Sequence, residues 1–285
     1  EISLGLVGSE MCIRDRSENR PFSMETAACD EEYEPSSEYD SSFALQIFAA
    51  REAVFKILAK ESLSIHEKLI VILDMGSKIQ QCINTDEYDN IKSVVNDYLK
   101  EGIAHTLDET RNLSDSGQFE DISLQQGIRQ ILYPYEEMEV LNPEWEVILK
   151  DIIDSLFEQM SDEEYNILNE EFGTYMVSRA YEYRQLLEYL VFRYFAKSIY
   201  DYDFLGKCQM LVTNFFVIRQ MDIIRWLDNH REYSFKDRMD VVHIFSRQVE
   251  YSEDNIENLY EDFIFDDIFK TDSLIAILWI DSENI

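Results

Sequence analysis

The amino-acid sequence predicts an all-α fold, namely a multi-helix, bundle-like single domain that follows a disordered acidic segment. The chain of 285 residues has only 8 glycines and 4 prolines, which is few for a fold that needs many hairpin turns. From Phe43 onward, apolar residues recur three and four positions apart, as one face of an α-helix requires. Hydrophobic residues at 46% and aromatic residues at 13% suffice to build a large core from these helices.

Capping residues mark where the first helices begin and end. Ser64 and Glu67 form a capping box, in which each side chain can bind a backbone N–H group at the start of the second helix. A third helix is predicted over residues 86–101, with Gly102 as its C-cap. The polar residues 106–118 are predicted to form a loop.

Prolines delimit the helices in the middle of the chain. A helix over residues 119–132 is expected to end before Pro134, because the residue that precedes a proline is disfavoured in helical geometry. Asn142 followed by Pro143 predicts the start of another helix, with asparagine as the cap and proline at the first helical position.

The last part of the chain is predicted to be the most deeply buried. A second capping box, Ser161 with Glu164, leads into an aromatic region in which apolar residues occupy two adjoining helical faces. One face comprises Tyr183, Leu187, Leu190 and Tyr194, and the other comprises Leu186, Tyr189, Phe192 and Phe195. Further helices are predicted over residues 204–227, 234–249, 253–265 and 271–280.

Three sections of the chain are distinguished by composition. Residues 1–16 fit no helical pattern and resemble a translated sequencing adapter, so we expect the natural protein to begin further upstream. Residues 17–41 are acidic and predict a disordered linker. Residues 42–285 are predicted to form the helical domain.

The formal net charge of −33 argues against binding to nucleic acid, because neutralising phosphates requires a clustered basic surface. No apolar run approaches the roughly 18 residues that indicate a membrane-spanning helix. The cysteines are widely spaced and lack a CxxC pair, which favours buried thiols in a reducing cytoplasm over metal ligands. The histidines show no spacing typical of a metal site, so no metal ligand is predicted.

Candidate site residues are the arginines that lie within apolar helices, Arg193, Arg219 and Arg247. Each of them could form a structural ion pair, extend its charged end to water, or hold a carboxylate or phosphate group of a ligand. Arg247 and Glu250 are three residues apart and are expected to share one helical face, with His243 four residues before Arg247. No glycine-rich phosphate loop and no nucleophile motif is present.

Seven segments carry a resemblance that covers residues 43–278. They are AAREAVFKIL (49–58), IHEKL (65–69), KIQQ (78–81), YLVFRYF (189–195), IYDYD (199–203), VIR (217–219) and FSRQVEYS (245–252). In combination they resemble the carboxy-terminal portion of flagellin lysine-N-methylases of the FliB type. Tyr251 departs from this pattern, in which a histidine usually occupies that position.

The resemblance implies a protein-lysine N-methyltransferase that transfers methyl groups from S-adenosylmethionine to lysines of flagellin, in the cytoplasm. It also implies an iron–sulfur cluster held by cysteines of an amino-terminal half without a counterpart in these 285 residues. No cofactor site is identifiable in this sequence, and we expect the chain alone to be inactive or only to bind substrate. Tyr189, Arg193, Arg219, Arg247 and Glu250 are the candidates for contacts with substrate or cofactor, and no catalytic residue is assigned.

Methyl transfer requires a neutral lysine amine, although the ordinary lysine pKa is about 10.4. Carboxylates would attract the ammonium form, and tyrosine rings suit both the ammonium group and a sulfonium group. The alternative is a non-catalytic, acidic helical module that binds a basic protein partner, since acidic surfaces and buried tyrosines also occur without catalysis.

Overall fold

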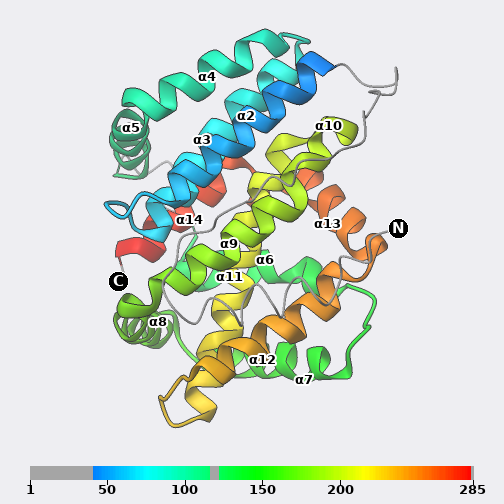
Figure 1. The fold of residues 1–285 in the computed structure, drawn as a ribbon. Coiled ribbons are helices and arrows are strands. Elements are labelled where there is room, and N and C mark those ends of the chain that lie inside the picture. The colour runs from blue at the N-terminus through cyan, green and yellow to red at the C-terminus, as the bar shows by residue number, and fades with distance from the viewer. Residues whose placement is uncertain (1–40, 116–121, 284–285) are drawn as a thin grey trace.

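The computed structural model describes residues 41–115 and 122–283, and this part of the chain contains helices and no strands (Figure 1). The segments predicted as adapter and acidic linker lie outside it, apart from Ser41. The helices are α2 (Ser41–Leu58), α3 (Ile65–Asn84), α4 (Ile91–Asp97), α5 (Ile103–Asp115), α6 (Leu124–Glu136), α7 (Pro143–Ile152), α8 (Asp162–Met176), α9 (Ala180–Tyr194), α10 (Ser198–Asp201), α11 (Phe204–Asp228), α12 (Phe235–Phe245), α13 (Glu253–Phe265) and α14 (Thr271–Glu283). The predicted all-α fold class is confirmed.

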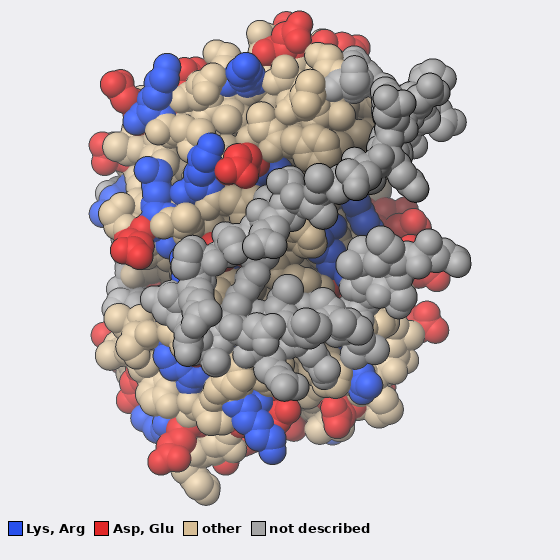
Figure 2. All heavy atoms as spheres, viewed as in Figure 1, with Lys and Arg blue, Asp and Glu red and all other residues tan. Residues whose placement is uncertain are grey.

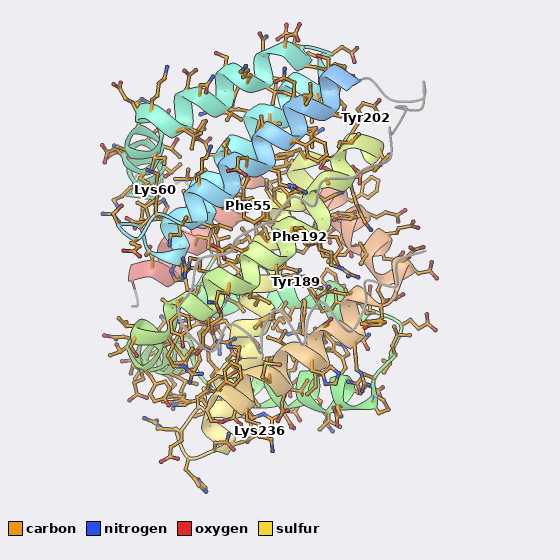
Figure 3. The ribbon with its side chains drawn as sticks, in the orientation of Figure 1. Phe55, Lys60, Tyr189, Phe192, Tyr202 and Lys236 are labelled. Atoms are coloured by element: carbon orange, nitrogen blue, oxygen red, sulfur yellow. The ribbon has the colours of Figure 1, made fainter. Side chains whose placement is uncertain are left out.

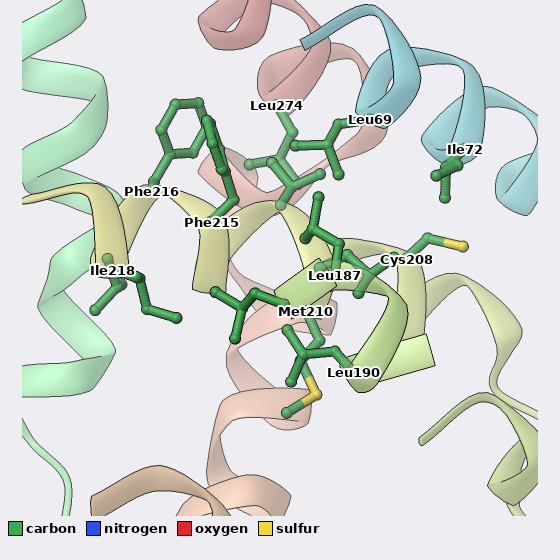
Figure 4. Packing of buried hydrophobic residues seen from close by; sticks show 14 of the residues in the cluster. Leu69, Ile72, Leu187, Leu190, Cys208, Met210, Phe215, Phe216, Ile218 and Leu274 are labelled. Carbon is green, nitrogen blue, oxygen red and sulfur yellow. The ribbon is translucent and has the colours of Figure 1, made fainter. Parts of the chain in front are cut away.

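Helix α11 is the centre of the fold. It has 25 residues, and every residue from 206 to 224 is buried. Helices α3, α6, α7, α9 and α12 all pack against it. Figure 4 shows this packing, in which Phe215 of α11 lies near Leu69 of α3 and Leu274 of α14. Burial of such side chains contributes roughly 2 kcal/mol each, which makes this core the main source of stability.

A glycine allows α3 and α11 to approach each other closely. A Cβ atom at Gly76 would lie 2.5 Å from Sγ of Cys208, which is closer than two such atoms can pack. Gln80, one turn further along α3, accepts hydrogen bonds from the backbone N–H groups of Phe204 and Leu205 at 2.8 and 3.1 Å. Helix α3 therefore both packs against α11 and caps its first turn.

The predicted helix starts are confirmed where a capping side chain defines them. Ser64 and Glu67 form a complete capping box at α3. Ser161 and Glu164 do the same at α8. Asn142 caps α7, whose first residue is Pro143.

Two boundaries predicted from single residues are wrong. Gly102 is not a C-cap, because the chain passes through a π-helical segment (Tyr98–Gly102) directly into α5. Residues 106–115 of the loop predicted at 106–118 are therefore helical, and residues 116–118 lie outside the described part. Thr106 and Thr110 are buried in α5 and bind Asp74 and the backbone, so these polar residues face the core and not water.

The helix end predicted before Pro134 is also wrong, because Pro134 lies inside α6 and the helix continues to Glu136. The reason is tertiary packing of the next residue. Tyr135 is fully buried, and its hydroxyl group bonds to Thr213 and Asn214 of α11 at 3.1 and 2.7 Å. These contacts outweigh the hydrogen bond that a proline removes from a helix.

Two further π-helical segments extend helices. Residues Ile153–Glu158 follow α7, and residues Ser246–Glu250 follow α12. We call the second one the 246–250 segment. In this wider turn, two side chains that are three residues apart are separated by a larger angle about the helix axis than in an α-helix. In the described part of the chain, no helix combines the length and the apolar character that crossing a bilayer requires.

Candidate functional site

A groove of about 590 Å³ lies between α7, α11 and α12, and we call it the α7/α12 groove. Its volume is within the range of small-ligand sites. Four carboxylates, two arginines, one histidine and four aliphatic residues line it: Glu144, Asp151, Asp228, Asp240, Arg225, Arg247, His243, Val147, Ile148, Ile224 and Ile244. Figure 2 shows acidic and basic side chains close together along the lower edge of the molecule, where Figure 1 places α7 and α12.

His243 near the end of α12 and Arg247 in the 246–250 segment both line this groove. Arg247 is exposed. In the described part of the chain, Nε2 of His243 is buried without a hydrogen-bond partner. A polar group that enters the groove could satisfy this atom, since unpaired buried polar groups are costly.

Glu250 faces away from this groove, although it is only three residues beyond Arg247. Its side chain is 3% exposed and lies against α9. The hydroxyl group of Tyr189 donates to its Oε2 at 2.9 Å, and Nε of Arg193 lies 3.0 Å from the same oxygen. Arg193 also donates to the backbone carbonyl of Glu250 at 3.3 Å. Figure 3 labels Tyr189 on α9.

The chemistry of this Tyr189–Arg193–Glu250 cluster is that of a buried ion pair. Burial raises the pKa of the Glu250 carboxyl group, while Arg193 and the bond from Tyr189 act in the opposite direction. Burial and the carboxylate together raise the pKa of Tyr189 above its ordinary value. The cluster holds the 246–250 segment to α9 by charge-assisted bonds.

Arg219 belongs to a different cluster. Its guanidinium group donates to the side chain of Asn169 at 3.0 and 3.2 Å, and its Nε lies 3.8 Å from Asp281. Asp281 also accepts bonds from Asn169 at 2.5 Å and meets Nε2 of His66 at 2.6 Å. Burial raises the pKa of Asp281, but Arg219 and His66 outweigh it and lower the pKa to about 2. This cluster ties α3, α8, α11 and α14 together.

The structure therefore separates the five predicted site residues into three places. Tyr189, Arg193 and Glu250 lie together, Arg247 lines the α7/α12 groove, and Arg219 is part of the buried Asp281 cluster. The expected pairing of Arg247 and Glu250 on one face is wrong, because the π-helical turn places them on different sides of the segment.

Sequence reasoning missed a third buried cluster around Asp222. This residue is fully buried and accepts bonds from Tyr183 and Arg238, both at 2.6 Å, and from the hydroxyl group of Tyr233. Arg238 also pairs with Glu182 at 3.1 Å. Burial raises the pKa of Asp222, and Arg238 opposes it. The signal that could have found it is an aspartate within the apolar run of α11, which needs partners as much as the arginines do.

The described residues do not fit an iron–sulfur cluster. Such a cluster needs several cysteine thiolates around it. Cys82 and Cys208 are free and buried, as predicted, and Cys208 fills the contact with Gly76. The described part of the chain has no group of three or more His, Cys, Asp or Glu residues that could hold a metal ion.

The fold and the groove define an all-helical domain whose carboxylate-rich surface groove is supported by buried ion pairs. A family model described as the FliB lysine N-methylase C-terminal domain matches residues 51–277. The chain belongs to this family, which confirms the family expected from the sequence. No curated protein and no solved structure matches the chain.

Proposed function

We propose that this chain contributes the C-terminal domain of a cytoplasmic methyltransferase that methylates flagellin lysines with S-adenosylmethionine, and that the α7/α12 groove binds the lysine-bearing segment. The observation that carries the proposal is that four carboxylates and four aliphatic side chains line one groove in a member of a lysine N-methylase family. When bound to the enzyme, S-adenosylmethionine supplies the methyl group. We propose that the cysteines of the cluster lie in a part of the enzyme other than the described residues.

The groove offers both features that a lysine side chain requires. Asp228 and Asp240 would attract the ammonium group, since carboxylates favour a cation even near the surface. Ile224 and Ile244 would pack against the four methylene groups and exclude water from them. Desolvation lowers the pKa of an amine and so favours the neutral form that accepts a methyl group.

The α7/α12 groove also meets some of the demands of S-adenosylmethionine. The carboxylates of the groove could bind the ammonium and sulfonium groups of S-adenosylmethionine. Arg225 or Arg247 could bind its carboxylate group. We assign the groove to lysine because carboxylates outnumber arginines in its lining. In this proposal Tyr189, Arg193 and Glu250 are positioning residues, which keep the 246–250 segment, and thereby Arg247, in place.

The test uses the full-length enzyme and a flagellin peptide that contains one lysine. Asp228→Asn combined with Asp240→Asn should raise the KM for the peptide about tenfold with little change in kcat, because the variant loses ground-state attraction. The thermal protection by S-adenosylmethionine should stay unchanged. The matched control is Glu163→Gln combined with Glu170→Gln, two exposed carboxylates on α8.

Each part of the proposal has its own contradicting result. An unchanged KM in the groove variant would exclude the groove as the lysine site. Lost protection by S-adenosylmethionine would assign the groove to the methyl donor. A wild-type enzyme that methylates no lysine and gains no protection would leave the alternative, a non-catalytic module, which is favoured by the internal pairing of Tyr189, Arg193 and Glu250.

A further inference from the structure

The outer face of α13 carries two adjacent apolar side chains, Ile264 and Phe265, that are exposed to solvent. Ile264 is 75% exposed and Phe265 is 78% exposed, which makes them the most exposed large apolar side chains of the described residues. The opposite face of α13 packs into the core through Ile256, Leu259 and Phe263. Single exposed apolar residues are common, whereas adjacent ones with a polar rim are typical of interaction sites.

Carboxylates surround this apolar pair. Glu257 and Glu261 precede it on the same exposed face at helical spacing. Asp266 and Asp267 follow it directly, and Asp267 pairs with Lys270 at 2.5 Å. Burial raises the pKa of neighbouring Asp262, and the carboxylates of Asp266, Glu137 and Glu261 raise it further. Figure 1 places α13 at the right edge of the molecule, where Figure 2 shows acidic side chains.

A second hollow of about 480 Å³ begins at the residue after Phe265. Its lining consists of Tyr133, which is 53% exposed, Ile268, Gln130, Asp266, Asp267 and Arg129. The charge of Arg129 is paired with Glu136. The hollow thus adjoins the end of α13 through Asp266 and could accept a further side chain. We call the outer face of α13 and this hollow the α13 surface.

We propose that the α13 surface docks a basic amphipathic helix of a partner protein. Apolar side chains of the partner would cover Ile264 and Phe265, and its lysines or arginines would face Glu257 and Glu261. Charge complementarity selects this occupant over a second copy of the chain, because two copies would bring their carboxylates together. The surface is separate from the α7/α12 groove, so the inference does not depend on methyl transfer.

The test uses the purified chain and a fluorescent 18-residue peptide of leucine and lysine at helical spacing, with a scrambled peptide of the same composition. Fluorescence anisotropy should show tighter binding of the amphipathic peptide than of the scrambled one. Ile264→Ser combined with Phe265→Ser should weaken that binding at least tenfold. Glu257→Gln combined with Glu261→Gln should weaken it and reduce its dependence on salt.

Helix α8 provides matched controls, because Ile167 is 53% exposed and lies between Glu163 and Glu170 on one face. Ile167→Ser, and Glu163→Gln combined with Glu170→Gln, should leave peptide binding unchanged. Circular dichroism will show that every variant keeps its helices.

Three results would overturn the inference. The first is a wild-type chain that binds both peptides equally or binds neither. The second is equal losses in the α8 and α13 variants, which would indicate attraction to the net charge alone. The third is wild-type self-association in sedimentation that disappears in the Ile264 and Phe265 variant, since that would identify a second copy as the occupant.

Discussion

Oε2 of Glu250 lies 3.0 Å from Nε of Arg193, so a cation of α9 holds the buried carboxylate of the 246–250 segment. Tyr189 donates to the same oxygen. Two donors of α9 thus meet at one carboxylate oxygen of the 246–250 segment. Because removal of one partner leaves the other buried without compensation, this contact should be sensitive to substitution.

Arg193→Met should destabilise the chain by about 2 kcal/mol, less than a fully buried pair because a quarter of the arginine side chain is exposed. Arg247→Met should change the free energy of unfolding by less than about 0.5 kcal/mol, since Arg247 is exposed. Urea unfolding of both variants measures the difference. Equal losses would mean that Arg247 has a structural role of its own.

Glu250→Gln should alter how stability depends on pH. The pKa of Glu250 is raised in the folded chain, so ionisation favours the unfolded state. The free energy of unfolding of the wild type should therefore fall, relative to the variant, as pH rises from the ordinary glutamate pKa of 4.5 through the raised pKa. Urea unfolding at several pH values gives both curves. Exposed Glu163→Gln should follow the wild type, and parallel curves for Glu250→Gln would contradict the prediction.

Asp281→Asn should show the opposite dependence. The pKa of Asp281 is lowered to about 2, so its ionised form stabilises the folded chain above the ordinary value of about 3.9. Between pH 4 and 2 the wild type should lose about 2 kcal/mol relative to the variant. Acid titration followed by circular dichroism measures this loss. Exposed Asp108→Asn serves as the control, and a wild type without the additional loss would contradict the assigned pairing.

Gly76→Ala should destabilise the chain by about 2 kcal/mol, because the new methyl group overlaps Sγ of Cys208. Cys208→Ala removes that sulfur atom and should recover a large part of the loss when the two substitutions are combined. A double-mutant cycle in urea gives the coupling energy. Additive effects would show that the sulfur atom of Cys208 is not the source of the loss.

Sequence alone predicted the helices whose signals are local. The capping boxes at Ser64 and Ser161 use only residues within one turn, and both are present. Pro134 failed as a boundary because distant contacts of Tyr135 decide there, and Gly102 failed because the local turn is π-helical. The buried hydroxyl group of Tyr135 keeps α6 helical, and the π-helical turn at Gly102 continues into α5.

Local sequence signals likewise predicted only part of the arrangement of the candidate residues. Burial in apolar helices correctly indicated that Arg193 and Arg219 would find partners. Their partners, Glu250 and Asn169, are 57 and 50 residues away in sequence, and no local pattern identifies them. Arg247 and Glu250 were placed on one face by α-helical spacing, which a π-helical turn does not follow.

The complete burial of α11 has a consequence for how its backbone exchanges hydrogen with the solvent. A helix with a solvent-exposed face can exchange amide protons through local openings, but residues 206–224 have no exposed face. Their amides should exchange only when the whole domain unfolds. Their exchange rates therefore give the free energy of global unfolding of the domain without denaturant. Because Ile224 also forms part of the groove wall, a ligand bound there should slow the same amides by the factor that its affinity and concentration set.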